Sequence, residues 1–425
     1  MPQLNQSEPL VAFIGIDWAD QKHFVSLCTA EQKVPEHYEL EHQPEAIVQW
    51  LSGLQQRFPG QRLAVALEQS RGPLIYALMS YDFLVLYPVN PQTLAKYRKA
   101  FCVSGAKDDP VDADLLRELV TLHRDRLRAW RPDDELTRTL TLLVQYRRDL
   151  VDNGTRLTNQ LSSLLKLYYP QALQWAGDLT TVQACEFLQR WPTLEKVQRT
   201  APGKLRQFYQ AHGCRKADLI SERLAQIAAA KSLTQDRAVI TATVSMVQAI
   251  INQLRPLLLD IARLNQQLEE LFAAHPDREV FSSLPGAGRV LAPRLLVALG
   301  ADRTRFASAQ EVLQFSGIAP VIERSGKTCF VHRRFACPKF LRQSFHEYAA
   351  QSIRWSPWAR AYYQQQRQRG QKHHAAVRSL AFRWIRIIFS CWQTRRPYSE
   401  DAYQQTLRRR GSGLANLLIA SEAAR

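Results

Sequence analysis

Short apolar runs punctuate the first ninety residues, and two of them end on an acid. Residues 13–19 read FIGIDWA and residues 63–69 read LAVALEQ, so Asp17 and Glu68 each close an apolar segment. Such runs between turn signals predict buried strands. Further elements are predicted as strands over 23–29, 34–42 and 83–89 and as helices over 45–57 and after Gly72-Pro73. Three strands followed by alternating helices and strands indicate an α/β domain with a ribonuclease H-like mixed sheet.

A carboxylate at the end of a buried strand needs a partner, because an unpaired buried charge is strongly disfavoured. Residues 107–119, KDDPVDADLLREL, supply two more acids, with Asp109 and Asp112 at the N-cap and N3 positions of a predicted helix. Both acids also suit simple capping and the helix dipole. Joined with Asp17 and Glu68, they form a set of hard oxygen ligands for two Mg²⁺ ions that can clamp a scissile phosphate. Asp108 is an alternative to Asp109.

The middle of the chain has helical periodicity. Apolar residues recur every three or four positions from Leu136 to Tyr168, with Arg147 and Gly154 as interruptions. A second run, from Val244 to Phe272, follows a heptad pattern. It contains one polar seam position, Asn265, and a proline, Pro256, which predicts a kink or break. The two runs fit either a dimeric coiled coil or an intramolecular helical hairpin, and residues 170–235 between them predict a mainly helical insertion.

The carboxyl-terminal part is predicted to be mainly helical. Residues 283–300 place a PGAG turn before an apolar helix, which fits a helix-hairpin-helix-like element whose amides hold a phosphate, or a plain turn. Ser325 lies in an Arg-Ser-Gly-Lys turn, and Ser316 in QFSGIAP is a competing Ser-Gly pair better suited to packing. Most aromatic residues downstream are expected in the core. The candidate nucleic-acid contacts are Lys107, Gly286, Gly288, Arg289, Arg324, Lys327, Arg333, Arg334, Lys339 and Arg342.

The charge distribution narrows the class of partner. The chain has 425 residues and a net charge of +17, and the segment from Val321 to Arg410 holds nineteen Lys or Arg against four acids. Such an excess favours a polyanion, nucleic acid ahead of an anionic membrane surface. Seven scattered cysteines without a CxxC pair suggest neither a zinc site nor disulfides. With no signal peptide or spanning segment in the pattern, the expected location is the cytoplasm, in association with the nucleoid.

These patterns predict four regions along the chain. Residues 1–130 form the sheet domain with the acids, and residues 131–275 form the helical coiled-coil region with the insertion. Residues 276–398 form the basic serine-containing domain, and residues 399–425 form a tail. The length prior of about two to four domains agrees with this division.

Taken in order, Asp17, Glu68, K-D-D-P-V-D-A, the helical middle, LPGAGRVLAPRLLVALG and SGIAP…RSGK resemble the transposases of the insertion sequence 110 group. The resemblance spans Phe13 to Gln393. It implies a RuvC-type domain joined through a coiled coil to a domain with a serine nucleophile. It places the acidic tetrad on Asp17, Glu68, Asp109 and Asp112, with Mg²⁺ as cofactor, and the nucleophile on Ser325.

The resemblance also implies partners and a reaction. The serine hydroxyl would attack a DNA phosphate and form a phosphoserine link. A structured bridge RNA would pair with donor and target DNA, and a homo-oligomer, dimer or tetramer, would share each working site between subunits. Two other readings of the residues stay open: a metal-only nuclease or junction resolvase, and a non-catalytic nucleic-acid-binding scaffold.

Overall fold

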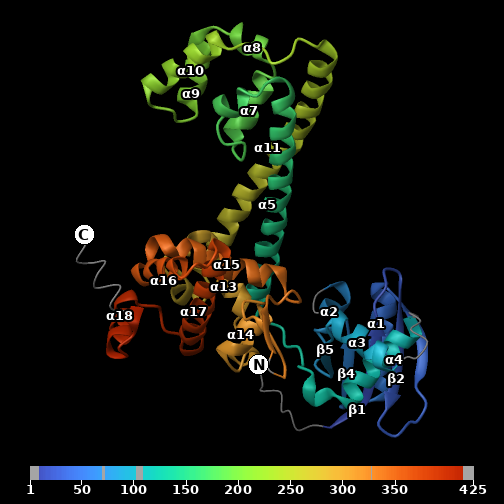
Figure 1. Cartoon of the computed structure of the whole chain (residues 1–425). Helices are drawn as coiled ribbons and strands as arrows, with labels where there is room; N and C mark the ends of the chain where they lie inside the picture. The colour runs from blue at the N-terminus through green and yellow to red at the C-terminus, as the bar shows by residue number, and fades with distance from the viewer. Residues whose placement is uncertain (1–8, 69–71, 102–108, 327, 415–425) are drawn as a thin grey trace. The chain divides into compact units, whose positions relative to one another are not determined.

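The protein divides into two units, Met1–Pro132 and Asp133–Arg425. The computed structural model describes residues 9–68, 72–101, 109–326 and 328–414. The first unit contains a five-stranded sheet, and the second is helical apart from a two-stranded hairpin (Figure 1). The predicted subdivision of the second unit at residues 275 and 398 stays a prediction.

The sheet has the strand order β3-β2-β1-β4-β5. Its strands are β1 (Leu10–Asp17), β2 (Lys22–Thr29), β3 (Glu36–Glu41), β4 (Arg62–Leu67) and β5 (Leu84–Pro88). The first three strands are antiparallel neighbours, whereas β4 is parallel to both β1 and β5. The five strands and the mixed sheet predicted from the apolar runs are therefore confirmed, with small shifts at the strand ends.

Alternation along β1 divides its side chains between two cores. Ile14 and Ile16 pack with the helices α1 (Pro44–Arg57) and α2 (Pro73–Leu78). Phe13 packs on the opposite face, with α3 (Pro91–Phe101) and α4 (Asp109–Leu122). A 3-10 turn, Arg124–Arg126, follows α4. The sheet is thus covered by helices on both faces.

Helix α4 lies directly on the backbone of β1. A Cβ atom on Gly15 would lie 2.0 Å from the carbonyl oxygen of Ala113 and 2.5 Å from the amide nitrogen of Arg117. Ser26, the cross-strand partner of Gly15, donates its hydroxyl to Asp114 at 2.6 Å and accepts from Arg117 Nε at 2.9 Å. Only glycine permits this approach, and the polar contacts with β2 fix the helix in register.

Two long helices form the spine of the second unit (Figure 1). Helices α5 (Glu135–Tyr168) and α11 (Arg237–Ala273) pack against each other within the chain, which is the intramolecular alternative. The two interruptions in the first run have matching residues on α11. Arg147 Nε donates to Asn265 Oδ1 at 2.6 Å, and a Cβ on Gly154 would lie 3.3 Å from Leu257 Cδ2.

Of the kink or break expected at Pro256, the break is wrong, because α11 continues through the proline. Leu254 and Leu257, on either side of the proline, are buried in the interface with α5 and the insertion. Packing therefore offsets the roughly 3 kcal/mol that an interior proline costs a helix.

Between these two helices, the insertion builds a core of its own. It consists of α6 (Ala172–Trp175), α7 (Val182–Arg190), α8 (Leu194–Gln198), α9 (Pro202–Ala211) and α10 (Ala217–Ala229). Trp175, Phe187 and Tyr209 are fully buried there, beside Leu161 and Leu165 of α5. The predicted helical insertion is confirmed as a packed element.

A fourth core forms at the other end of the α5–α11 pair. Its elements are α12 (Arg278–Ser282), α13 (Gly288–Leu299), a 3-10 turn (Arg303–Arg305), α14 (Ala309–Phe315), β6 (Val321–Ser325), β7 (Thr328–His332), α15 (Lys339–Trp355), α16 (Pro357–Gln368), α17 (His373–Thr394) and α18 (Glu400–Arg409). Trp358, Trp384 and Trp392 are fully buried, as expected for most aromatic residues of this region. No helix within the described ranges is long and apolar enough to span a membrane.

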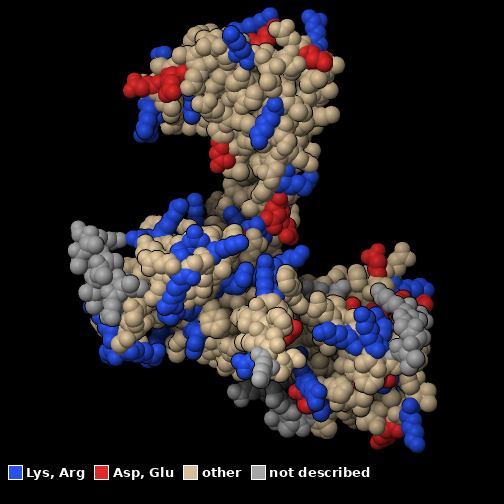
Figure 2. All heavy atoms as spheres, in the orientation of Figure 1, with Lys and Arg blue, Asp and Glu red and all other residues tan. Residues whose placement is uncertain are grey.

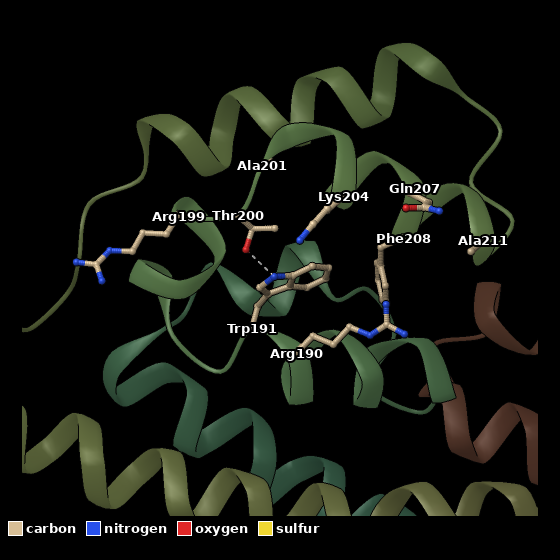
Figure 3. Close-up of a pocket in the computed structure, with 9 residues that line it drawn as sticks. All are labelled: Arg190, Trp191, Arg199, Thr200, Ala201, Lys204, Gln207, Phe208 and Ala211. Atoms are coloured by element: carbon tan, nitrogen blue, oxygen red, sulfur yellow. Dashed lines mark hydrogen bonds between the residues drawn. The ribbon is translucent and has the colours of Figure 1, made fainter.

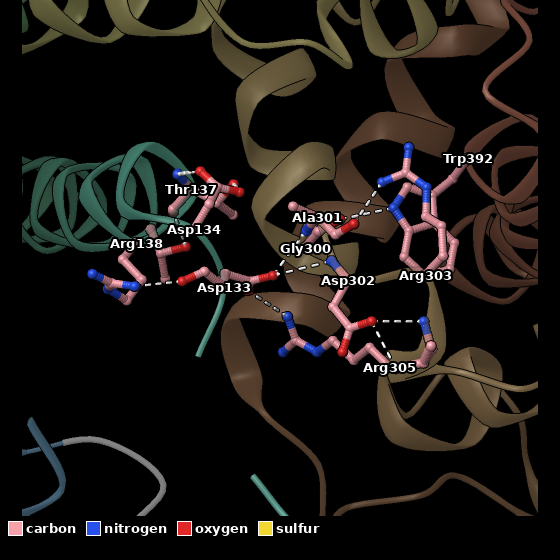
Figure 4. Close-up of polar contacts among 12 residues, drawn as sticks. Asp133, Asp134, Thr137, Arg138, Gly300, Ala301, Asp302, Arg303, Arg305 and Trp392 are labelled. Carbon is pink, nitrogen blue, oxygen red and sulfur yellow. Dashed lines mark hydrogen bonds and ion pairs between the residues drawn. The ribbon is translucent and has the colours of Figure 1, made fainter. Parts of the chain in front are cut away.

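The first residue of the second unit is anchored to this core (Figure 4). Asp133 Oδ1 accepts hydrogen bonds from the amides of Ala301 at 2.8 Å and Asp302 at 3.3 Å. Gly300, just before them, has φ +79° and accepts from Trp392 Nε1 at 2.7 Å. The entry to α5 is therefore tied to the turn that follows α13.

Replacing Gly15 with alanine should destabilise the first unit by about 2 kcal/mol or more, because the new methyl group forces α4 away from β1. Thermal unfolding of the full chain measures this. Gly53→Ala is the matched control: Gly53 is an exposed residue of α1 with nothing within 4 Å of a Cβ, so the change should be neutral or slightly stabilising. Equal unfolding temperatures for the two variants would contradict the close contact.

Candidate active site

The parallel register of β1 and β4 places two of the predicted acids side by side at the carboxyl ends of these strands. Ile16 pairs with Leu67; Asp17 is the last residue of β1, and Glu68 directly follows β4. Alternation continues the row of Gly15 and Ala66, so both acids belong to the face that carries α4. Carboxyl ends of neighbouring parallel strands are a common place for catalytic groups in α/β folds.

The other two acids lie in the first turn of α4. Asp112 precedes Ala113, the residue whose carbonyl meets Gly15, so the backbone contact brings Asp112 to the strand that ends at Asp17. Asp109 is exposed and is the first residue of the helix, not its N-cap as expected. Lys107 and the alternative acid Asp108 lie outside the described residues.

Asp112 is buried, with 2% of its surface exposed, and forms a bidentate ion pair with Arg98 of α3. Arg98 Nε donates to Oδ1 at 2.6 Å, and its Nη2 donates to Oδ2. Sequence reasoning missed Arg98, because fourteen residues separate the pair and no motif connects them. The guanidinium supplies the partner that a buried carboxylate requires.

The acids suit a divalent metal in chemistry and in backbone placement. In the parts of the chain that the structure describes, however, no three His, Cys, Asp or Glu side chains are grouped closely enough to hold a metal ion. Asp112 instead holds Arg98. Each carboxylate oxygen keeps a second lone pair, through which Asp112 would serve as a metal ligand beside the guanidinium.

A pair of histidines, of which His23 is fully buried, supports the turn that follows Asp17. His23 accepts from the amide of Ala19 at 3.3 Å, and its other ring nitrogen lies 2.9 Å from His42 Nδ1. Burial, and next the nearby His42, lower the pKa of His23 to about 4. The ring is therefore neutral at physiological pH and can accept the Ala19 hydrogen bond. Nothing in the sequence pattern distinguished this histidine.

Ser325 lies at the tip of the β6–β7 hairpin and is exposed. It pairs with Thr328 across the turn, where Gly326 has φ +54°. Ser316, by contrast, is fully buried, and its hydroxyl donates to the carbonyl of Leu313 at 3.3 Å. The interpretation of Ser316 as a packing residue is confirmed, which leaves Ser325 as the accessible hydroxyl of the two.

Cations surround the base of this hairpin. Burial, followed by the charges of Arg333 and Arg342, lowers the pKa of Arg378 on α17. Among the described residues, none of these three arginines has a carboxylate partner, so their charge is available to an anion. On the face drawn in Figure 2, Lys and Arg predominate over the carboxyl-terminal helices. The other predicted cations here are Arg324, Arg334 and Lys339, whereas Lys327 lies outside the described residues.

The PGAG turn is observed between α12 and α13, and its first glycine has a packing role. Gly286 has φ +78°, and a Cβ there would lie 2.5 Å from Trp355 Cδ1. Gly288 has φ +53° with open space beside it, and Arg289 is exposed. Phosphate binding by this turn stays a prediction, centred on Gly288 and Arg289 more than on Gly286.

Comparison with known proteins defines the class of the chain as a transposase. Residues 14–170 match the family described as "Transposase", of the DEDD type, and residues 278–364 match the "Transposase IS116/IS110/IS902 family". The first match contains all four predicted acids, and the second contains Ser325.

Similarity to individual proteins agrees with these two family matches. The chain is 32% identical over 404 residues to the mini-circle putative transposase for IS117 of Streptomyces coelicolor, covering 93% of this chain and 97% of that protein. It is 27% identical over 295 residues to the IS110 uncharacterized 43.6 kDa protein of the same species, covering 67% and 70% of the two chains. It is 27% identical over 344 residues to the IS116 uncharacterized 44.8 kDa protein of Streptomyces clavuligerus, covering 80% of this chain and 84% of that protein.

The chain therefore belongs to the IS110/IS116 family of insertion-sequence transposases. The resemblance drawn from its ordered motifs is confirmed. Membership implies an enzyme that cleaves DNA and transfers strands, and the DEDD type implies dependence on a divalent metal.

Replacing Arg98 with alanine should lower the stability of the first unit by about 3–5 kcal/mol, because the buried Asp112 carboxylate loses its partner. Thermal unfolding without divalent metal measures the loss. Lys99→Ala removes a neighbouring exposed cation of the same helix and should change stability by less than about 0.5 kcal/mol. An Arg98→Ala protein as stable as the Lys99→Ala protein would show that the ion pair does not neutralise Asp112.

Proposed function

We propose that this transposase cuts and rejoins DNA through a phosphoserine link at Ser325, with Mg²⁺ held by Asp17, Glu68, Asp109 and Asp112 in a ribonuclease H-like, RuvC-type domain. The observation that carries the proposal is the register of β1 and β4, which aligns Asp17 with Glu68 on the face where α4 starts. A strand order of 3-2-1-4-5 with this mixture of directions supports the domain type.

The four acids are proposed as the metal ligands, and Arg98 is proposed to orient one of them, Asp112. Bound there, a divalent metal would stabilise negative charge on the scissile phosphate. Arg98 holds the Asp112 carboxylate in one orientation through its two hydrogen bonds. The histidine pair at His23 holds the turn after Asp17, so this ligand is attached to a supported backbone.

At Ser325 the proposed step is a transesterification. The Ser325 oxygen forms a bond to the DNA phosphorus, a phosphorus–oxygen bond of the DNA backbone breaks, and the departing sugar oxygen takes up the proton. One phosphodiester replaces another, so the reverse step can rejoin strands without a nucleotide cofactor. The exposed hairpin leaves the hydroxyl accessible, and the unpaired arginines at its base supply charge for neighbouring phosphates.

The proposed partners are donor and target DNA, a structured bridge RNA that selects both, and further copies of the chain in a dimer or tetramer. The net charge of +17, concentrated in the carboxyl-terminal quarter, supports polyanionic partners. Residues proposed for these contacts are Lys107, Gly286, Gly288, Arg289, Arg324, Lys327, Arg333, Arg334, Lys339 and Arg342.

A covalent-adduct assay tests the serine. End-labelled donor DNA is incubated with Mg²⁺ and with protein co-expressed with its flanking element, and the products are run on denaturing gels. The protein should give a shifted protein–DNA band that Ser325→Ala abolishes. Thr328→Ala, which removes the hydroxyl opposite Ser325 in the same hairpin, should keep the band. Cleavage without any shifted band, equal in all three proteins, would favour a metal-only nuclease or resolvase.

Neutralising a proposed metal ligand should abolish both the adduct and strand cleavage. Asp17→Asn and Asp112→Asn should each lose about a thousandfold or more in rate, because several kcal/mol of transition-state stabilisation disappear. The control is Glu118→Gln, on the same helix, whose carboxylate lies 3.9 Å from Arg117 Nη2 and which should keep cleavage. Retained cleavage by Asp112→Asn would overturn the ligand set, and binding without cleavage in every protein would indicate a non-catalytic scaffold.

A further inference from the structure

The helical insertion contains a cavity of about 770 Å³ that no part of the proposed reaction uses. Its nine lining residues belong to the end of α7, the segment after α8, and α9 (Figure 3): Arg190, Trp191, Arg199, Thr200, Ala201, Lys204, Gln207, Phe208 and Ala211. The two family matches end at residue 170 and resume at residue 278, so the cavity falls between them. Its size suits a ligand larger than a single inorganic anion.

The lining is positively charged. Arg190, Arg199 and Lys204 contribute cations, and no acid lines the cavity. The Arg199 charge is offset by Glu195 at 2.6 Å, and in Figure 3 its guanidinium extends away from the other lining side chains. Lys204 has no ion-pair partner among the described residues, and in Figure 3 its amine points over Trp191. Arg190 shares Glu186, at 3.6 Å, with Arg255 at 3.2 Å. One carboxylate cannot neutralise both arginines, so an anion is favoured in the cavity.

The start of α9 adds to this charge. Its first residue, Pro202, has no amide hydrogen, and Ala201, which lines the cavity, offers no side-chain cap. The helix therefore begins at the cavity wall without a side-chain acceptor. The partial positive charge of its amino terminus acts in the same direction as Lys204 and Arg190.

Two aromatic rings make the wall rigid. Trp191 and Phe208 meet edge to face, with centroids 5.0 Å apart, and are 7% and 3% exposed. Trp191 Nε1 donates to Thr200 Oγ1 at 2.8 Å, and the Arg190 guanidinium lies 5.2 Å from the Phe208 centroid. The little ring surface left open therefore has a fixed orientation beside cations. Such a combination suits a planar base attached to a phosphate.

We propose that this cavity binds one unpaired nucleotide of a nucleic-acid strand. Lys204 and Arg190 hold its phosphate, the base lies against the exposed edge of Trp191 and Phe208, and the Gln207 amide faces the base edge. A base within a duplex is stacked and paired, so it cannot enter. The site thus selects a single-stranded or bulged position, in RNA or in DNA.

Photocrosslinking with the full-length protein in EDTA tests the proposal. The probes are single-stranded 12-mers of RNA with 4-thiouridine and of DNA with 4-thiothymidine, and each is also used as a duplex. Peptide mapping should find crosslinks within residues 190–211 for at least one single-stranded probe and at most a tenth of that yield for its duplex. The yields of the two single-stranded probes show whether RNA or DNA is the preferred source.

Lys204→Glu and Arg190→Glu should each reduce that crosslink about tenfold, and Lys204→Glu should reduce the salt slope of binding by about one. Lys196→Glu makes the same charge change at an exposed position of α8 outside the lining and should keep the crosslink. Thermal unfolding verifies that each variant is folded. If Lys204→Glu does not fold, Lys204→Gln takes its place. Crosslinks only outside residues 190–211, equal duplex yields, or an equal loss in Lys196→Glu would overturn the site. Because EDTA prevents cleavage, this outcome is independent of the Ser325 adduct.

Discussion

The contact between Gly15 and the backbone of α4 is the constraint on which the first unit depends. A strand and a helix meet there without any side chain between them, at 2.0 Å from a hypothetical Cβ to the Ala113 oxygen. The same contact closes one core, presses Arg117 and Asp114 onto β2, and brings the first turn of α4 to the strand that ends at Asp17. The stability of the fold and the placement of the acids therefore both depend on the absence of a side chain at Gly15.

Much of this arrangement is legible in the sequence. Apolar runs that end on acids predicted the strands, and parallel pairing then requires Asp17 and Glu68 to share an edge. Arg98 was not predictable, because its pairing with Asp112 depends on how α3 packs beside α4 and not on a spacing within either helix. Gly15, an isolated glycine in a strand, is the signal that could have indicated a close backbone approach.

The second unit shows where patterns are ambiguous. A heptad has the same appearance whether its partner is another chain or another helix of the same chain, and here α5 fills that role for α11. The two residues that interrupt the apolar pattern of α5 have complementary partners on α11: Arg147 donates a hydrogen bond to Asn265, and Gly154 leaves room for Leu257. The β6–β7 strands escaped prediction because charged residues and a short turn interrupt their alternation, and both strands are largely exposed.

The paired helices α5 and α11 also set the distance between two cores of the second unit. Leu140 and Phe272 belong to the core beside the serine hairpin, whereas Leu165 and Val247 belong to the core of the insertion. Leu140 and Leu165 are 25 residues apart on α5, so these two positions lie about 38 Å apart at 1.5 Å per residue. This distance equals about eleven stacked nucleotides at 3.4 Å each. A stacked nucleic acid shorter than that can contact one of the two positions but not both.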